Sequence, residues 1–381
     1  MNSLKQTYTE RQMIRNSCIL CKNTDFEKVC ILHNYPSSFS PGIEEDYKND
    51  ILTNLVFKGC TSCGCVQLET LIDPNILYQG YHNETSNTPT WKQHHELFSS
   101  FFLTRFEGKK VLELGGYTGV LAKKIIDKLS CEYTILDIVK KNPNHIGIQY
   151  ISENCEEFTY RDHKTVIMSH IFEHIYNPIE FIKKLSDDGV QDIYISLPNM
   201  SALLERRNIC ILQVEHTFYI DEHDIKSMFS NEGFVCSSQE YFKNHSIFFH
   251  FQKHLQCLPY THVNKERLYK QKEICTQIDS VLSSIELKQP CFIAPAGHYG
   301  QKIYYYLQKH SDYIIGFLDN DPCKIGNRVY GTPKLVFSPS ELTKYVDQQI
   351  TIILFAGPYK DEIKKQYSQI HPNIEFIDLN I

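Results

Sequence analysis

The feature that most constrains the fold is the direct succession of a strand, a glycine turn and a helix near residue 115. Residues 111–119 read Val-Leu-Glu-Leu-Gly-Gly-Tyr-Thr-Gly, and residues 120–129 have the apolar spacing of a helix. Glycine allows a tight turn and a close approach to a ligand, because it has no Cβ and adopts positive φ at little cost. We therefore predict a nucleotide-like cofactor at Gly115, Gly116 and Gly119.

Such a turn also occurs in dinucleotide-binding sites, so the residues around it must decide which cofactor it binds. Glu113 precedes the first glycine, where a carboxylate would repel a pyrophosphate but can anchor the amino-acid end of S-adenosylmethionine. The next predicted strand, residues 133–137, ends in Asp137, an acid suited to accept hydrogen bonds from two ribose hydroxyls. Both features favour S-adenosylmethionine as the cofactor.

Three further strand-like segments extend this pattern along the chain. Glu153 and Asn154 follow the third strand and are assigned to the adenine, although a solvated loop explains them equally well. The fourth strand ends at Ser169, which we also assign to the cofactor, and the fifth covers residues 192–199. Alternation of strands and helices predicts a doubly wound α/β sheet that binds ligands at the carboxyl ends of its strands.

Two CxxC pairs mark the N-terminal segment. Cys18 with Cys21, and Cys60 with Cys63, each place two thiolates on one turn. Four thiolates form a closed tetrahedral site that suits a structural zinc ion. The stretch between the pairs is polar, so metal binding would supply much of the folding energy of this segment. Coincidence among the 14 cysteines of the chain is the competing explanation.

A histidine next to a carboxylate is the candidate for acid–base chemistry. Glu215 and His216 precede a helix predicted over residues 217–229, with Asp221 as its cap. An imidazole titrates near neutral pH, and an adjacent carboxylate can orient it if the fold turns both side chains the same way. A histidine that only bonds the backbone at a helix entrance is the competing interpretation.

The C-terminal part repeats the pattern of strand, glycine turn and helix over residues 291–304. A strand ending in Asp319 follows, and then a glycine-punctuated loop with Lys324 and Arg328, two cations that could meet phosphate. These features predict a second, smaller Rossmann-like domain. A purely structural lid would have the same pattern.

Residues 169–178, Ser-His-Ile-Phe-Glu-His-Ile-Tyr-Asn-Pro, together with the glycine turn resemble the class I methyltransferases. The order of the parts over almost the whole chain resembles the nucleoside-diphosphate-sugar C-methyltransferase family. This resemblance implies methylation of a carbon of a ketosugar through an enolate. It implies His216 as the base beside Glu215, His174 as a second active-site histidine, and Tyr81 as an active-site residue in the arm that follows the cysteine pairs.

Two departures from that family leave the acceptor atom open. The Tyr-His-Glu-His segment of the family reads Gln213-Val-Glu-His216 here, and its His-Gly-Gly-Ser segment reads His-Ser-Ile-Phe at 245–248. If the acceptor were a sugar hydroxyl, His216 would deprotonate oxygen, so an O-methyltransferase is the runner-up. A nicotinamide-dependent sugar oxidoreductase and a non-catalytic zinc protein that binds nucleic acid are more remote possibilities.

Length and charge set the remaining expectations. A chain of 381 residues exceeds one hydrophobic core. We expect a zinc-binding segment at 1–75, an arm over the active site at 76–104, the cofactor domain at 105–255, a linker helix at 256–285 and the smaller domain at 286–381. The net charge of -6 argues against unspecific nucleic-acid binding. The N-terminus lacks the apolar stretch of a signal peptide, and no apolar run of about 20 residues occurs. We expect a cytoplasmic monomer or homodimer with a small-molecule substrate and no nucleic-acid or membrane partner.

Overall fold

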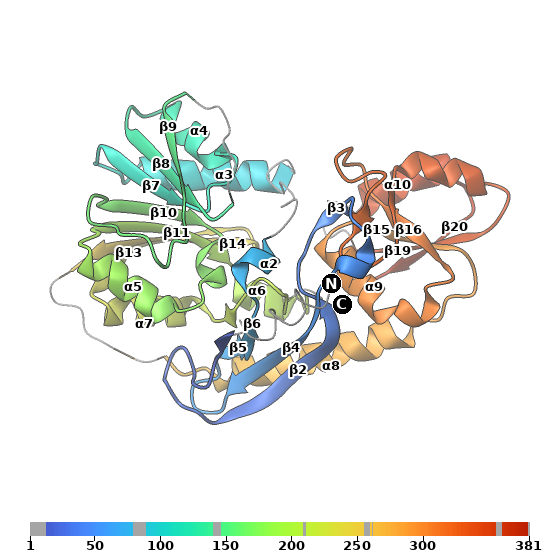
Figure 1. Cartoon of the computed structure of the whole chain (residues 1–381), viewed down its shortest axis with the longest axis horizontal. Helices are drawn as coiled ribbons and strands as arrows, with labels where there is room; N and C mark the ends of the chain where they lie inside the picture. The colour runs from blue at the N-terminus through green and yellow to red at the C-terminus, as the bar shows by residue number, and fades with distance from the viewer. Residues whose placement is uncertain are drawn as a thin grey trace.

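Two α/β lobes are joined at their base by N-terminal strands and one long helix (Figure 1). The computed structural model describes residues 13–78, 89–139, 146–208, 211–254, 260, 262–355 and 360–379. In Figure 1 the central lobe is cyan to green, the C-terminal lobe is orange to red, and the N-terminal strands are blue. Within the described ranges, no helix has the length and apolar character needed to cross a bilayer.

A seven-stranded sheet with the order β13-β14-β11-β10-β7-β8-β9 forms the centre of the first lobe. Its strands are β7 (Lys110–Leu114), β8 (Glu132–Asp137), β9 (Ile148–Ser152), β10 (Thr165–Ser169), β11 (Asp192–Pro198), β13 (Phe234–Phe242) and β14 (Ser246–Lys253). Strands β7 to β11 are parallel, whereas β14 is antiparallel to both of its neighbours. This antiparallel hairpin distinguishes the sheet from the all-parallel dinucleotide-binding fold.

Alternate residues of the parallel strands face two different layers of helices. Leu112 and Met168 pack on the layer of α5 and α7, whereas Val111 and Ile167 pack on the layer of α3 and α4. The helices are α3 (Pro89–Leu103), α4 (Val120–Ile126), α5 (Pro178–Asp187) and α7 (Glu222–Asn231). Because helices cover both faces, the central strands β7, β10 and β11 are mostly apolar and buried, and this made them visible in the sequence.

Part of the arm expected at residues 76–104 is a core element of the central lobe. Phe98, Phe101 and Phe102 of α3 are buried and pack with Val111 of β7. The lobe therefore begins before residue 105, because α3 belongs to it. Of the other described residues of this arm, Ile76 and Leu77 belong to the short helix α2 (Pro74–Leu77).

The N-terminal segment contains more sheet than its polar sequence suggests. Strands β2 (Phe26–Pro36), β4 (Leu52–Cys60) and β5 (Val66–Leu68) are antiparallel, and β12 (Phe218–Tyr219) adds an edge strand from the central lobe. Two small pairs extend it, β1 (Met13–Ile14) with β6 (Thr70–Leu71) and β3 (Pro41–Ile43) with β17 (Arg328–Val329). Tyr35, Leu55 and Phe57 are buried in its core. The segment is thus tied to both lobes and is no separate unit.

The C-terminal lobe has a five-stranded sheet with the order β18-β16-β15-β19-β20, parallel throughout. Its elements are β15 (Cys291–Ala294), α9 (His298–Tyr306), β16 (Ile314–Leu318), β18 (Val336–Phe337), β19 (Ile350–Leu354), α10 (Lys360–Ile370) and β20 (Ile374–Asp378). A parallel sheet with a glycine turn after its central strand is a Rossmann-like arrangement.

Helix α8 (Lys265–Ser284) connects the lobes at their base. Leu268, Ile274, Ile278 and Leu282 form one buried face at helical spacing and pack in a core shared with β2 and the C-terminal lobe. At its start Arg267 pairs with Asp221 at 3.1 Å and with Asp224 on α7. The expected linker helix therefore packs against both lobes and connects them.

Candidate active site

A cleft of about 1760 Å³ lies between the two lobes. The central lobe contributes the turn after β7, the ends of β8 and β10, and the segment around residue 215; the C-terminal lobe contributes the turn after β15 and the start of α9. Both sheets thus direct the carboxyl ends of their strands to one cavity, which is where α/β proteins bind ligands.

The glycine turn after β7 forms one end of this cleft. Gly115 has φ +66°, and a side chain there would overlap Ile171. A Cβ on Gly116 would lie 2.8 Å from the Glu113 carboxyl carbon. Gly119 has φ +79° and is the N-cap of α4. Glycine is therefore required at all three positions, by conformation or by space, and the turn keeps its backbone close to the cleft.

Glu113 lies beneath this turn rather than at its surface. Its side chain is buried and accepts a hydrogen bond from the Tyr133 hydroxyl at 2.9 Å. Burial raises the pKa of Glu113 to about 8, so most of this group is protonated at neutral pH. Such a neutral carboxyl supports the turn and does not repel an anionic ligand above it.

The remaining residues assigned to the cofactor gather around the turn. Asp137 ends β8, lines the cleft and accepts backbone hydrogen bonds from Tyr117 at 2.9 Å and Val139 at 2.8 Å. Glu153 and Asn154, after β9, line the same wall. The buried Ser169 hydroxyl at the end of β10 has no hydrogen-bond partner among the described residues. Acid, amide and hydroxyl thus surround a site for a polar, nucleoside-like ligand.

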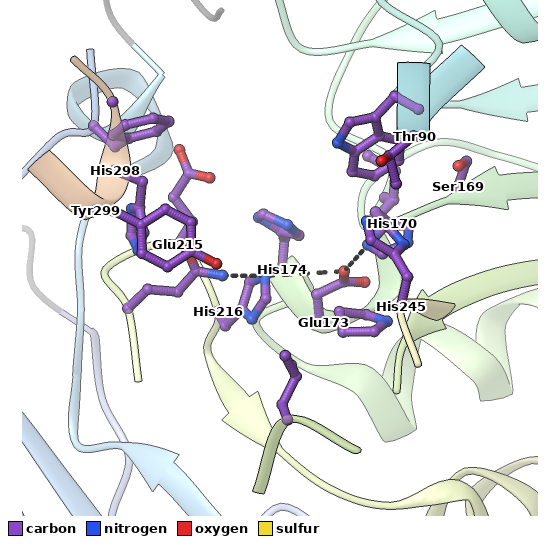
Figure 2. A pocket seen from close by; sticks show the side chains of 18 of the residues that line it. Thr90, Ser169, His170, Glu173, His174, Glu215, His216, His245, His298 and Tyr299 are labelled. Atoms are coloured by element: carbon purple, nitrogen blue, oxygen red, sulfur yellow. Dashed lines mark hydrogen bonds and ion pairs between the residues drawn. The ribbon is translucent and has the colours of Figure 1, made fainter. Parts of the chain in front are cut away.

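Two imidazoles lie farther along the cleft, next to each other (Figure 2). The ring centroids of His174 and His216 are 5.0 Å apart. His174 Nδ1 is 3.1 Å from the Tyr78 hydroxyl, and His216 Nε2 is 2.6 Å from the Gln213 side-chain amide. Burial, then the neighbouring His174, lowers the pKa of His216 well below its usual value. His216 is therefore neutral near pH 7, the state that a general base requires.

A second carboxylate, besides the expected Glu215, approaches His216. Glu215 lines the same cleft, but the ion-pair contact joins His216 Nε2 to Glu173 Oε1 at 3.9 Å. Glu173 also approaches His170 Nδ1, at 3.3 Å. The loop after β10 brings Glu173 to His216 from a distant part of the chain.

A second group of rings borders the cleft beside this loop. Trp91 of α3 lies 4.8 Å from His170 and 5.0 Å from His245 between ring centroids. His170 Nε2 is 2.8 Å from the Ser246 hydroxyl. Burial lowers the pKa of both His170 and His245 to about 3, so this wall is uncharged at neutral pH.

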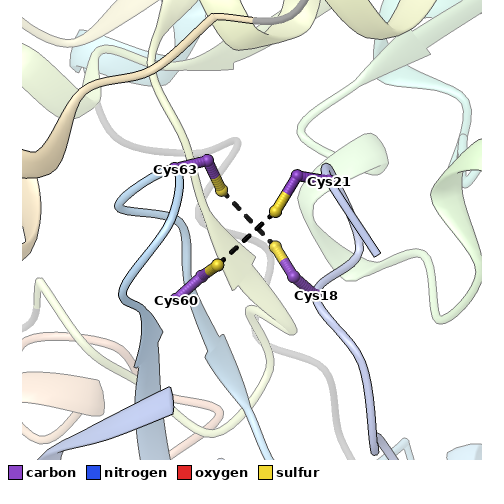
Figure 3. A group of neighbouring side chains, drawn as sticks. All are labelled: Cys18, Cys21, Cys60 and Cys63. Carbon is purple, nitrogen blue, oxygen red and sulfur yellow. Dashed lines mark hydrogen bonds between the residues drawn. The ribbon is translucent and has the colours of Figure 1, made fainter. Parts of the chain in front are cut away.

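The four cysteines of the two CxxC pairs meet at one point (Figure 3). Sγ distances are 3.5 Å between Cys18 and Cys63 and between Cys21 and Cys60, and all four sulfurs lie within 4.8 Å of one another. Zn–S bonds of about 2.3 Å in a tetrahedron require S···S distances of about 3.8 Å. The donor set fits zinc, and four thiolates leave no position open for a substrate.

Arg15 connects this cysteine cluster to the imidazoles. Its guanidinium donates to the Tyr176 carbonyl at 2.6 Å and to the Thr217 hydroxyl at 3.0 Å. Thr217 in turn donates its backbone N–H to the Glu173 carbonyl at 3.0 Å. A residue three positions before Cys18 therefore holds together the two loops that carry His174 and His216.

Lys324 and Arg328, the two cations that could meet phosphate in the C-terminal lobe, both pair with carboxylates of the protein itself. Lys324 Nζ pairs with Asp319 at 2.9 Å and donates to the Ala296 carbonyl at 3.0 Å. Arg328 makes two hydrogen bonds to Asp50, at 2.6 and 2.8 Å. The sequence interpretation was wrong for Arg328, because Asp50 reaches it from the distant N-terminal segment.

Comparison with known proteins decides the reaction class. Residues 91–239 match the sequence model of a methyltransferase domain. The chain is an S-adenosylmethionine-dependent methyltransferase. The match favours methyl transfer over the two remote possibilities, a nicotinamide-dependent oxidoreductase and a non-catalytic zinc protein. No match emerged from the comparison with curated proteins.

Solved structures of methyltransferases are similar to a part of the chain. The 1,6-didemethyltoxoflavin-N1-methyltransferase of Burkholderia thailandensis, bound to S-adenosylhomocysteine, is 9% identical, with a TM-score of 0.35; the match covers 44% of this chain and 81% of that one. The magnesium protoporphyrin IX methyltransferase of Synechocystis PCC 6803, also with S-adenosylhomocysteine, is 14% identical, with a TM-score of 0.36; the match covers 46% of this chain and 89% of that one.

The methyltransferase site contains residues that sequence reasoning missed. Tyr81, expected in the arm, lies outside the described residues, and Tyr78 from the same arm contacts His174. Glu173 was passed over, although it stands next to His174. Its position in a His-x-x-Glu-His run was the available signal, but its contact to His216 depends on a pairing of distant loops.

Proposed function

We propose that the enzyme transfers a methyl group to a carbon atom of a nucleotide-linked keto- or deoxysugar through an enolate. The observation that carries this proposal is the continuity of the cleft, which joins the glycine turn, the His174–His216 pair and the start of α9 in one cavity. The resemblance to nucleoside-diphosphate-sugar C-methyltransferases includes the same three parts in the same order. S-adenosylmethionine, when bound, supplies the methyl group, and the residues around Gly115 and Asp137 would hold it.

The C-terminal lobe offers polar groups for the acceptor. His298, at the start of α9, lines the cleft opposite the imidazole pair (Figure 2). Neither of its ring nitrogens has a hydrogen-bond partner among the described residues. Burial lowers the pKa of His298 to about 3, so it acts as a neutral donor or acceptor. Polar groups left unpaired at a cleft suit a polar ligand such as a sugar or its phosphates.

His216 is the base in this proposal. It removes the proton α to the ketone, and the electron pair of the C–H bond stays on the acceptor as the enolate. Tyr78 and His174 are hydrogen-bonded to each other at 3.1 Å, so this pair supplies one further hydrogen-bond donor for the charge that develops on the enolate oxygen. The enolate carbon then takes the methyl group. His216 releases its proton after the product leaves.

A methylation screen over nucleotide-linked ketosugars, read by mass spectrometry and NMR, tests the acceptor. In D₂O without a methyl donor, the enzyme should exchange the α-proton of its ketosugar for deuterium. His216→Asn should lower methyl transfer roughly 10²- to 10⁴-fold, because it removes basicity and keeps size. His174→Asn should cost less. Cofactor affinity, measured by calorimetry, should stay within error, and full activity of His216→Asn would remove this residue from the mechanism.

A sugar O-methyltransferase is the second candidate, favoured by one observation. Gln213 stands where the resembled family has a tyrosine, and its amide contacts His216 Nε2 at 2.6 Å. The base therefore has a partner different from that of a carbon-acid enzyme of the family. Absence of deuterium exchange with the true acceptor, together with an O-methyl product, would establish this candidate.

We further propose that Cys18, Cys21, Cys60 and Cys63 hold one structural zinc ion. Chelation of the metal, or Cys18→Ser, should unfold the N-terminal strands, because the metal supplies much of their folding energy. Methyl transfer should fall at the same time, since Arg15 lies just before Cys18 and would lose its contacts to the imidazole loops. Thermal unfolding and metal analysis by mass spectrometry check both points. Freshly purified protein with ordered N-terminal strands and no zinc would refute the proposal.

A further inference from the structure

Glu173 occupies an unusual position between the two groups of imidazoles (Figure 2). Its Oε1 atom lies 3.3 Å from His170 Nδ1 on one side and 3.9 Å from His216 Nε2 on the other. The side chain is only 6% exposed. Neither carboxyl oxygen has a hydrogen-bond partner among the described residues. A buried carboxylate without hydrogen bonds is costly, so its retention next to a base requires an explanation.

The backbone holds Glu173 firmly against the segment that carries His216. Glu173 lies in the 3-10 turn η3 (Phe172–His174), directly after the strand β10. Its carbonyl accepts the Thr217 N–H at 3.0 Å, and the Thr217 hydroxyl donates to the Ile175 carbonyl at 2.6 Å. The relative position of Glu173 and His216 is therefore set by two interactions that do not involve either side chain.

We infer that Glu173 is the positioning residue of the base: its charge, 3.9 Å from His216 Nε2, stabilises the imidazolium that forms when His216 takes the proton of the acceptor. This inference rests on the proposed role of His216. During the step a bond forms between an imidazole nitrogen and the proton, the C–H bond breaks, and its electron pair remains on the acceptor. Glu173 keeps its negative charge, which is why it favours the charged state of its neighbour.

The surrounding charges give this pair a characteristic pH dependence. Burial raises the pKa of Glu173 to about 7; His174 opposes this shift and Glu215 adds to it. His170 is neutral throughout this range, and His298 adds to the lowering of the pKa of His216. As the pH falls through about 7, Glu173 takes up a proton and loses the charge that stabilises the imidazolium. The rate constant kcat should therefore fall below about pH 7.

Glu173→Gln, Glu173→Asp and a control variant in the full-length enzyme test this inference. We expect Glu173→Gln to lower kcat roughly 100-fold, with KM and cofactor affinity within about twofold, and to abolish the fall of kcat below pH 7. Glu173→Asp keeps the charge, so it should recover part of kcat and should again show the fall of kcat below about pH 7, which we call the acid limb. Deuterium wash-in to the acceptor should fall in parallel with kcat.

The control is Glu156→Gln. Glu156 supports the same loop by accepting the backbone N–H groups of Tyr176 and Asn177, both at 2.8 Å. The Glu156→Gln variant should have a lower thermal stability, but its kcat should still fall below about pH 7, as expected for a carboxylate with a purely structural role. If Glu156→Gln and Glu173→Gln gave the same kcat and pH profile, loop structure alone would explain both, and the inference would be wrong.

Two further outcomes would overturn the inference. Glu173→Gln could keep the wild-type kcat and acid limb. Alternatively, metal analysis could find a second ion, lost in Glu173→Gln, which would make Glu173 a metal ligand together with His174 and His216, whose ligand atoms lie within 4.8 Å of one another. Failure of the proposed function itself looks different: the wild type would show no deuterium wash-in, while the pH profile of methyl transfer in Glu173→Gln would still test Glu173.

Discussion

The two glycine turns of the protein have the same local plan and different surroundings. After β7, Gly115 adopts φ +66°, and Asp137 at the end of the adjacent strand accepts backbone hydrogen bonds at the cleft wall. After β15, Gly297 has an extended backbone with φ -169°. Asp319, which stands just after the adjacent strand β16, is paired with the buried Lys324 at 2.9 Å.

This difference shows what a glycine turn does and does not specify. Strand, turn and helix build a Rossmann-like layer in both lobes, because that pattern depends on local conformation and on apolar burial. Ligand binding depends on whether the acid beside the turn is still able to accept hydrogen bonds from a ligand. Lys324 neutralises Asp319, so we expect the central turn to bind the cofactor and the C-terminal turn to shape the acceptor side of the cleft.

Substitution of one glycine in each turn should give the largest difference in cofactor affinity between the two turns. Gly115→Val should abolish cofactor binding, because valine is strained at positive φ and would overlap Ile171. Gly297→Ala should leave cofactor affinity unchanged, since a Cβ there meets no atom within 4 Å. Calorimetry with S-adenosylmethionine and circular dichroism for folding check both variants. Equal cofactor affinity in the two would mean that the cofactor lies elsewhere.

Substitution of the two acids, Asp137 and Asp319, should give smaller effects. We expect the first substitution to weaken cofactor binding and the second to lower stability. Asp137→Asn should weaken cofactor binding roughly 10- to 100-fold, as expected for hydrogen bonds to a charged group. Asp319→Asn should leave cofactor affinity unchanged. It should lower the free energy of unfolding by about 3–5 kcal/mol, because the buried Lys324 would lose the carboxylate that pairs with its charge. Denaturant unfolding measures the second effect. A loss of cofactor affinity in Asp319→Asn would show that the C-terminal turn also contributes to cofactor binding.

The smallest effect concerns pH. The pKa of Glu113 is about 8 in the folded protein and lies above its unfolded value of 4.5. The stability it contributes is therefore fully present below about pH 4.5 and is lost as the pH rises from there through about 8. Glu113→Gln should flatten the decline of the melting temperature over this pH range. The C-terminal strand β15 (Cys291–Ala294) contains no carboxyl group, so a decline that persists in Glu113→Gln would have another origin.

The sequence was sufficient to predict that the residues assigned to the cofactor lie together in one cleft. Gly115, Asp137 and Ser169 stand at the ends of strands, and strand ends of a parallel sheet meet at one edge by topology alone. The apolar strands and the glycines were enough to place them. The acceptor half was harder, because Tyr78, Glu173 and His216 meet only when three loops from distant parts of the chain pack together.

By itself, the sequence determined the parallel strands of the central sheet, the glycine turn and the pairing of cysteines, because each depends on local conformation or on the chemistry of one residue type. The tertiary structure alone decided that α3 is a core helix, that Asp50 engages Arg328, and that Glu173 approaches His216. These outcomes depend on which buried charges and faces meet across the fold. Such meetings follow from packing between segments far apart in the chain, and no local pattern encodes them.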